Sequence, residues 1–110
     1  MDKTRVEIRV KEVSGAYRVS MRYMPFCKGF GDAMYHIDLY HEVERRVTKL
    51  AHVFGIENVV HEDHELAFIP QSRDLNYIMQ TLNKNKDIIA SEEELRRSEI
   101  KLEVVEVKKH

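Results

Sequence analysis

The residues best suited to chemistry are histidines and carboxylates in the middle of the chain. His61 and His64 bracket two acidic residues, and imidazole together with carboxylate oxygen suits Zn²⁺, Mn²⁺ or Fe²⁺. His41 or His52, on a predicted helix, would complete a divalent-metal site for metal-assisted hydrolysis. The His-Glu-x-x-His spacing of helical zinc sites is absent from the sequence, and a polar run between two strands is typical of an ordinary turn. A metal-dependent enzyme using His61, His64 and His41 is therefore an alternative hypothesis, and such a metal is the one cofactor we consider.

Five basic side chains fall on one side of a predicted N-terminal hairpin. Guanidinium groups spaced along neighbouring strands can contact successive phosphates of a nucleic acid. This side has no aromatic residue for base stacking, and a closing C-terminal strand would bring Glu99 and Glu103 towards it. A solvated sheet face is the ordinary alternative. The residues of the RNA- or DNA-binding hypothesis are Arg5, Arg9, Lys11, Arg18 and Arg22.

A loop that contains Pro and Gly connects this hairpin to the next element. A Gly-bearing loop before a helix could present N–H groups to an anion, but Asp32, as the expected N-cap, would occupy that position. The single cysteine, Cys27, excludes an intramolecular disulfide. We expect the loop either to anchor on the core or to contact a partner. The partner-contact residues are Phe26, Lys28 and Phe30.

The first element that positions these residues is a hairpin over residues 5–23. Apolar and polar residues alternate on either side of Ser14-Gly15, as in two half-buried strands. A one-residue slip would send every apolar side chain to the wrong face, so the register is well specified. A two-residue turn predicts four cross-strand pairs: Val6 with Tyr23, Glu7 with Arg22, Ile8 with Met21 and Val10 with Val19.

Apolar residues spaced three and four apart predict one long helix over about 32–54. Gly55 stands where a left-handed residue is needed after the helix, and Ile56 follows as its hydrophobic partner. We expect the apolar stripe to pack on the apolar face of the hairpin. The stripe consists of Ala33, Ile37, Tyr40, Val43, Val47, Leu50, Ala51 and Phe54.

The C-terminal half predicts a second hairpin, shorter helices and a closing strand. The hairpin joins residues 59–61 to 66–69 around a polar turn. Ser72 is expected to cap a helix whose stripe is Leu75, Ile78, Met79 and Leu82, and a capping box at Ser91 predicts a short helix over 92–98. Alternation over residues 100–104 indicates a strand. Its parity switches at Val105 and Val107, which predicts a bulge or an edge strand.

Length and composition indicate a single α+β domain over residues 1–110. With 43% apolar and 34% charged residues, the chain is globular rather than disordered. The order ββαββα(α)β predicts a mainly antiparallel sheet of two hairpins plus a C-terminal strand, with the long helix packed on the sheet. Because the sequence shows neither a secretory signal nor a long apolar run, we expect a cytoplasmic protein without membrane contact.

The uneven charge distribution favours a binding function. Residues 1–30 carry a net charge of +4 and residues 31–70 a net charge of −5, within a chain of net charge −1. Such opposed patches suit an anionic partner or contact between copies. The sequence lacks a Gly-x-Ser-x-Gly elbow, and an edge strand is a template for another chain. We therefore expect a small non-catalytic binding or regulatory module, acting through a protein partner or as a homodimer. Nucleic-acid binding and metal-dependent catalysis are the alternatives.

Overall fold

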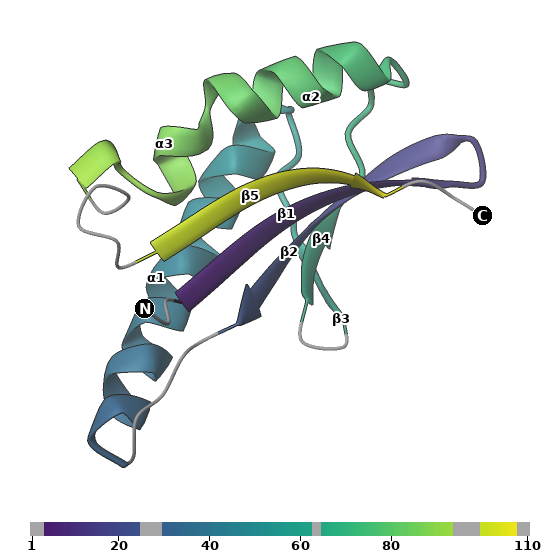
Figure 1. Ribbon diagram of the computed structural model, residues 1–110. Helices are drawn as coiled ribbons and strands as arrows, with labels where there is room; N and C mark the ends of the chain where they lie inside the picture. Colours follow the sequence, from purple (N-terminus) through teal and green to yellow (C-terminus); the bar gives the residue numbers. More distant parts are fainter. Residues whose placement is uncertain (1–3, 25–29, 63–64, 94–99, 108–110) are drawn as a thin grey trace.

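The computed structural model describes residues 4–24, 30–62, 65–93 and 100–107 (Figure 1). Its strands form one mixed sheet in the order β3-β4-β2-β1-β5. In chain order the elements are β1 (Thr4–Val13), β2 (Ala16–Met24), α1 (Phe30–Val53), β3 (Val60–Glu62), β4 (Glu65–Phe68), α2 (Leu75–Lys84), α3 (Lys86–Ile89) and β5 (Ile100–Val107). The three helices pack on the same face of the sheet, around one hydrophobic core. The predicted α+β class is confirmed.

The β1–β2 hairpin has the predicted register. Val6 lies opposite Tyr23, Glu7 opposite Arg22, Ile8 opposite Met21 and Val10 opposite Val19. Ser14 and Gly15 both have positive φ, 51° and 82°, as a type I′ turn requires. The period-two pattern and the turn residues therefore define this element together.

Helix α1 begins at Phe30, slightly earlier than expected, and ends at Val53. Asp32 therefore lies in the first turn, and the prediction that it is the N-cap is wrong. The predicted end is confirmed: Gly55 has φ +77°, and the Ile56 N–H donates to the Ala51 carbonyl at 3.0 Å, as in a Schellman motif. Among the stripe residues whose side chains the structure describes, four are buried in the same core as the hairpin: Val43, Val47, Leu50 and Ala51. The side chains of Ala33 and Ile37 lie outside the described ones.

The start of α2 corrects one predicted cap. The Asp74 Oδ1 atom accepts hydrogen bonds from the N–H groups of Asn76 and Tyr77, so Asp74 is the N-cap. Ser72 lies too far upstream for this role, and its hydroxyl oxygen accepts from the Asp74 N–H at 3.2 Å. The predicted stripe of α2 is confirmed, with Ile78 and Leu82 buried. Of the helix expected over 92–98, residues 92–93 are helical, and the others lie outside the described residues.

Strand β5 lies at one edge of the sheet and runs parallel to β1. Because β4 and β5 run in the same direction, the chain between them must cross the sheet, and α2 and α3 form this crossover. The pairing of β5 with β1 is unbroken from Ile100 to Val107. The change in the apolar alternation at Val105 therefore reflects an edge strand with apolar residues on both faces, and not a bulge. Within the ranges that the structure describes, no helix is long and apolar enough to cross a membrane.

Candidate interaction site

The face of the sheet opposite the core, called the outer face below, presents the basic residues of the nucleic-acid hypothesis. In the described parts of the chain the helices cover only the other face. Strand alternation places five basic residues on the outer face, three on β1 and two on β2. They are Arg5, Arg9, Lys11, Arg18 and Arg22.

Carboxylates interleave with these basic residues. Glu7 lies opposite Arg22 on β2 and opposite Glu103 on β5. The Arg9 Nε atom lies 3.0 Å from Glu7 Oε1, and the Arg18 guanidinium lies 3.5 Å from a carboxylate oxygen on β4. Strand β5 thus brings Glu103 to this face, as expected, whereas Glu99 lies outside the described residues. The outer face has mixed charge, which weakens its attraction for a polyanion.

The predicted partner-contact loop lies largely outside the described residues. This is the case for Phe26 and Lys28, as it is for Cys27. Phe30 is the first residue of α1, and its side chain is not among those described. The loop remains a prediction.

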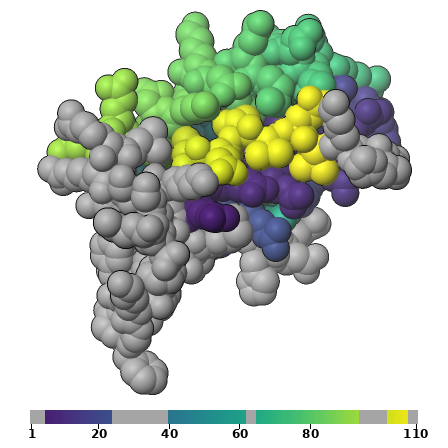
Figure 2. All heavy atoms as spheres, in the orientation of Figure 1, coloured from purple at the N-terminus to yellow at the C-terminus, as the bar shows by residue number. Residues whose placement is uncertain are grey.

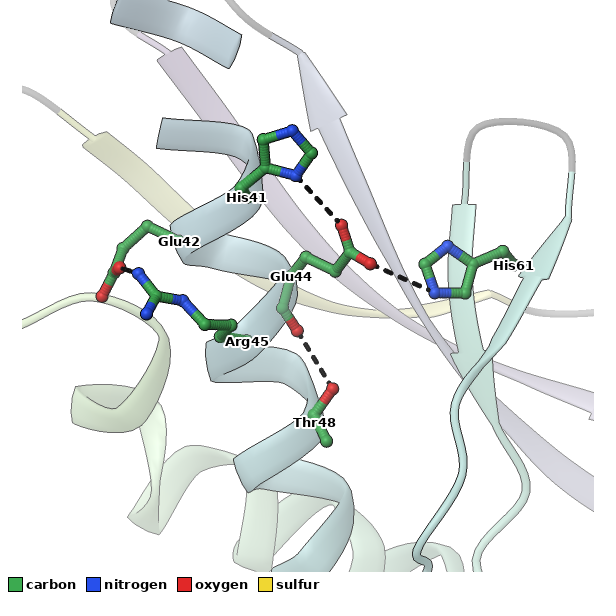
Figure 3. Close-up of polar contacts among 6 residues, drawn as sticks. All are labelled: His41, Glu42, Glu44, Arg45, Thr48 and His61. Atoms are coloured by element: carbon green, nitrogen blue, oxygen red, sulfur yellow. Dashed lines mark hydrogen bonds and ion pairs between the residues drawn. The ribbon is translucent and has the colours of Figure 1, made fainter. Parts of the chain in front are cut away.

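Two of the predicted metal ligands converge on a carboxylate that the sequence did not single out (Figure 3). The Glu44 Oε2 atom lies 3.6 Å from His41 Nδ1, and its Oε1 atom lies 3.3 Å from His61 Nε2. The two imidazoles lie on either side of the carboxylate, so α1 and β3 are connected through Glu44. His64 lies outside the described residues. Among the described side chains, no three His, Cys, Asp or Glu residues are arranged to hold a metal ion.

Tyr40 lies beside this cluster, and its pKa is shifted. Its ring packs edge-on against Tyr23, with ring centroids 5.5 Å apart, and against His41 at 5.8 Å. Burial, and secondarily the negative charge of Glu44, raises the pKa of Tyr40 above its ordinary value of 10.0. Both causes disfavour the phenolate. Tyr40 is therefore a protonated donor at neutral pH, unsuited to act as a base.

This shift predicts a loss of stability in alkaline solution. The unfolded chain ionises Tyr40 near pH 10.0, while the folded protein retains the neutral phenol. The contribution is fully present below that pH and is lost as the pH rises through the raised pKa. We expect the unfolding free energy of Tyr40→Phe to fall less above pH 10.0 than that of the wild type. Urea unfolding of both proteins below and above this pH would measure the difference. Parallel pH profiles for the wild type and Tyr40→Phe would contradict this assignment.

The longest exposed backbone edge of the described sheet belongs to β5. Its eight residues pair with β1 on one side, and no described strand pairs with the other side. Leu102 and Val104 pack against the core, while Val105 and Val107 are half-buried on the outer face. Figure 2 shows β5 as a yellow strip at the surface, between the green helices and purple β1. The opposite edge, β3, has only three residues.

A smaller apolar area lies at the corner of the sheet beside β3. Val60 and Ile69 are each 52% exposed there, next to a shallow hollow. Its lining residues are Arg18, Asn58, Val60, Ala67, Phe68 and Ile69. This corner borders β3, an edge strand of three residues, whereas the β5 edge runs over eight.

Comparisons with protein-family models, with curated proteins and with solved structures find no match for this chain.

Proposed function

We propose that the protein is a small non-catalytic interaction module that binds a protein partner by strand addition at the β5 edge. The observation that carries this proposal is the length of the edge. Eight residues pair with β1 alone among the described strands. At such an edge, alternate residues direct their backbone N–H and C=O groups away from the sheet. An added strand would satisfy those groups, and its side chains would provide specificity.

The residues of β5 suit this role on both faces. Proteins commonly protect an edge strand by making it short, by placing a proline or a bulge in it, or by charged side chains, of which β5 carries Glu103 and Glu106. Strand β5 has no proline and pairs with β1 without a bulge. Leu102 and Val104 on the core face, and Val105 and Val107 on the outer face, are only half-buried. A partner strand would cover more of this apolar surface, which contributes roughly 25 cal/mol for each Å² buried.

Nucleic-acid binding receives less support from the outer face. Glu7, Glu65 and Glu103 lie among its basic residues. Each of these carboxylates repels phosphate, so the surface lacks the single-sign charge of a typical nucleic-acid site.

Substitution of Val105 by lysine is expected to disrupt binding at the β5 edge. Extended peptides would be selected by display against the full chain, and their binding sites located by hydrogen exchange. We expect them to protect β5 amides and to bind Val105→Lys at least about tenfold more weakly, equivalent to 1.4 kcal/mol. The lysine replaces an apolar contact with a charge at the boundary between β5 and the added strand, and charged side chains commonly block strand addition at an edge.

Val60→Lys is the matched control. Val60 is an exposed valine on the same outer face, but it lies at the β3 edge. It should leave binding of the selected peptides unchanged, and circular dichroism would verify that both variants fold. If no peptide is selected although the chain is monomeric in solution, if the selected peptides protect another surface, or if both lysine variants weaken binding equally, the proposed function is wrong.

A further inference from the structure

We infer that the strand bound by β5 is the β5 strand of a second copy, so that the protein is a twofold-symmetric dimer whose two sheets join edge to edge. This inference rests on the proposed use of the β5 edge and names its occupant. A twofold axis perpendicular to the sheet makes the two β5 strands antiparallel. It also keeps the helices of both copies on the same side of the joined sheet.

Symmetry and charge restrict the register of the two β5 strands. Directly opposed residues of neighbouring strands lie on the same face of a sheet. The twofold axis must therefore pass between two identical residues, one from each β5 strand. An axis at Glu103 would place two carboxylates directly opposite each other, which is unfavourable. An axis at Leu102 or Val105 would leave more of β5 without a partner than an axis at Val104, which overlaps residues 101–107 of both copies. The Val104 axis pairs the two Val104 side chains and places Glu103 opposite Val105 of the second copy. Leu102 then lies opposite Glu106, so none of these pairs opposes like charges.

The outer face provides charge complementarity for this register. Within one chain, Glu103 lies directly opposite Glu7, and Val105 lies directly opposite Arg9. With Val104 on the axis, a row of residues across the seam reads Arg9, Val105, then Glu103 and Glu7 of the second copy. Arg9 already lies 3.0 Å from Glu7 of its own chain, and from there its guanidinium can extend over the short Val105 towards the acidic pair of the second copy. Symmetry provides this contact twice, which favours a second copy over an unrelated strand.

The dimer also accounts for the unequal lengths of the two edges. Joining the β5 strands removes the eight-residue edge from both copies. The joined sheet then ends at β3 on each side, a strand of three residues. Short edge strands resist further pairing. The assembly therefore closes at two copies instead of extending into a filament.

A charge-exchange experiment tests this dimer. Sedimentation velocity over a range of concentrations should show a reversible dimer for the wild-type chain. We expect Arg9→Glu and Glu103→Arg, each alone, to raise the dissociation constant at least about tenfold, because each homodimer then opposes like charges twice. An equimolar mixture should form heterodimers of nearly wild-type affinity. In that mixture, the arginine of Glu103→Arg faces the glutamate of Arg9→Glu, and both seam contacts again pair opposite charges.

The outcomes separate this inference from the proposed function. A wild-type chain that stays monomeric at all concentrations, or single variants that dimerise as well as the wild type, would overturn the β5 dimer. So would a mixture that forms no heterodimer. If selected peptides still protect the β5 amides in such a monomer, strand addition stands and only its occupant is wrong. Circular dichroism verifies that both variants fold, and Glu103→Arg places an arginine directly opposite Glu7 on β1.

Discussion

Replacement of Leu50 by alanine is expected to lower the free energy of unfolding by about 2–5 kcal/mol. Leu50 is only 2% exposed and lies in the core cluster between α1 and the sheet. Val47 and Ile8 belong to the same close-packed cluster, and such a core relaxes only in part around a truncated side chain. The loss therefore combines the transfer free energy of the removed methyl groups with the cost of a cavity. Urea unfolding with the wild-type m-value would measure the change.

Val53→Ala is the control for this prediction. Val53 lies on the same helix, but its side chain is 43% exposed, so its truncation should change stability by no more than about 0.5 kcal/mol. Equal losses for Leu50→Ala and Val53→Ala would mean that α1 does not dock on the sheet with the face described here. The stripe pattern read from the sequence would then be wrong as well.

The best-predicted parts of the fold are those defined by neighbouring residues. The β1–β2 register follows from strict alternation and from two turn residues that accept positive φ, Ser14 and Gly15. The end of α1 follows from Gly55 and Ile56, which complete a Schellman motif. In both cases the residues that form the hydrogen bonds lie within a few positions of each other. Local sequence therefore contains most of the information.

The features that the sequence did not predict depend on contacts between distant residues. Alternation identified β5 as a strand, but its parallel pairing with β1 depends on the crossover through α2 and α3. Glu44 is one of several polar residues on α1, and only its proximity to β3 brings it to His61. Its spacing of three residues from His41 was the available local signal. The α2 cap was missed because Ser72 and Asp74 are both good caps, and the first helical residue decides between them.

The β5 edge is better preorganised for binding than the polar cluster around Glu44. His41 and His61 both contact Glu44, but they are mostly exposed, with side-chain exposures of 65% and 57%. Exposed pairs of this kind contribute little to a fixed geometry. Strand β5 is held along its entire length by β1, so the backbone groups that no described strand pairs with are already extended for a partner strand. Such preorganisation lowers the entropic cost of binding.

Replacement of Arg46 by methionine is expected to lower the free energy of unfolding by about 1–3 kcal/mol. The Arg46 guanidinium Nη1 group donates to the Ile89 carbonyl at 2.8 Å, and its side chain is only 20% exposed. This contact connects α1 to α3, the end of the crossover that leads to β5. Methionine retains the aliphatic packing of the stem but withdraws the charged donor from that carbonyl. A hydrogen bond from a charged group is worth more than a neutral one.

Arg45→Met provides the comparison that identifies the cause of this loss. Arg45 and Arg46 both pair with Glu42, but the Arg45 side chain is 74% exposed. An exposed ion pair at this helical spacing contributes little to the free energy of unfolding, so Arg45→Met should change that free energy by no more than about 0.5 kcal/mol. A large loss for Arg46→Met alone would assign the effect to the Ile89 carbonyl and the α1–α3 contact. Equal losses for the two variants would assign it to Glu42 instead, and the connection between α1 and the crossover would then not depend on Arg46.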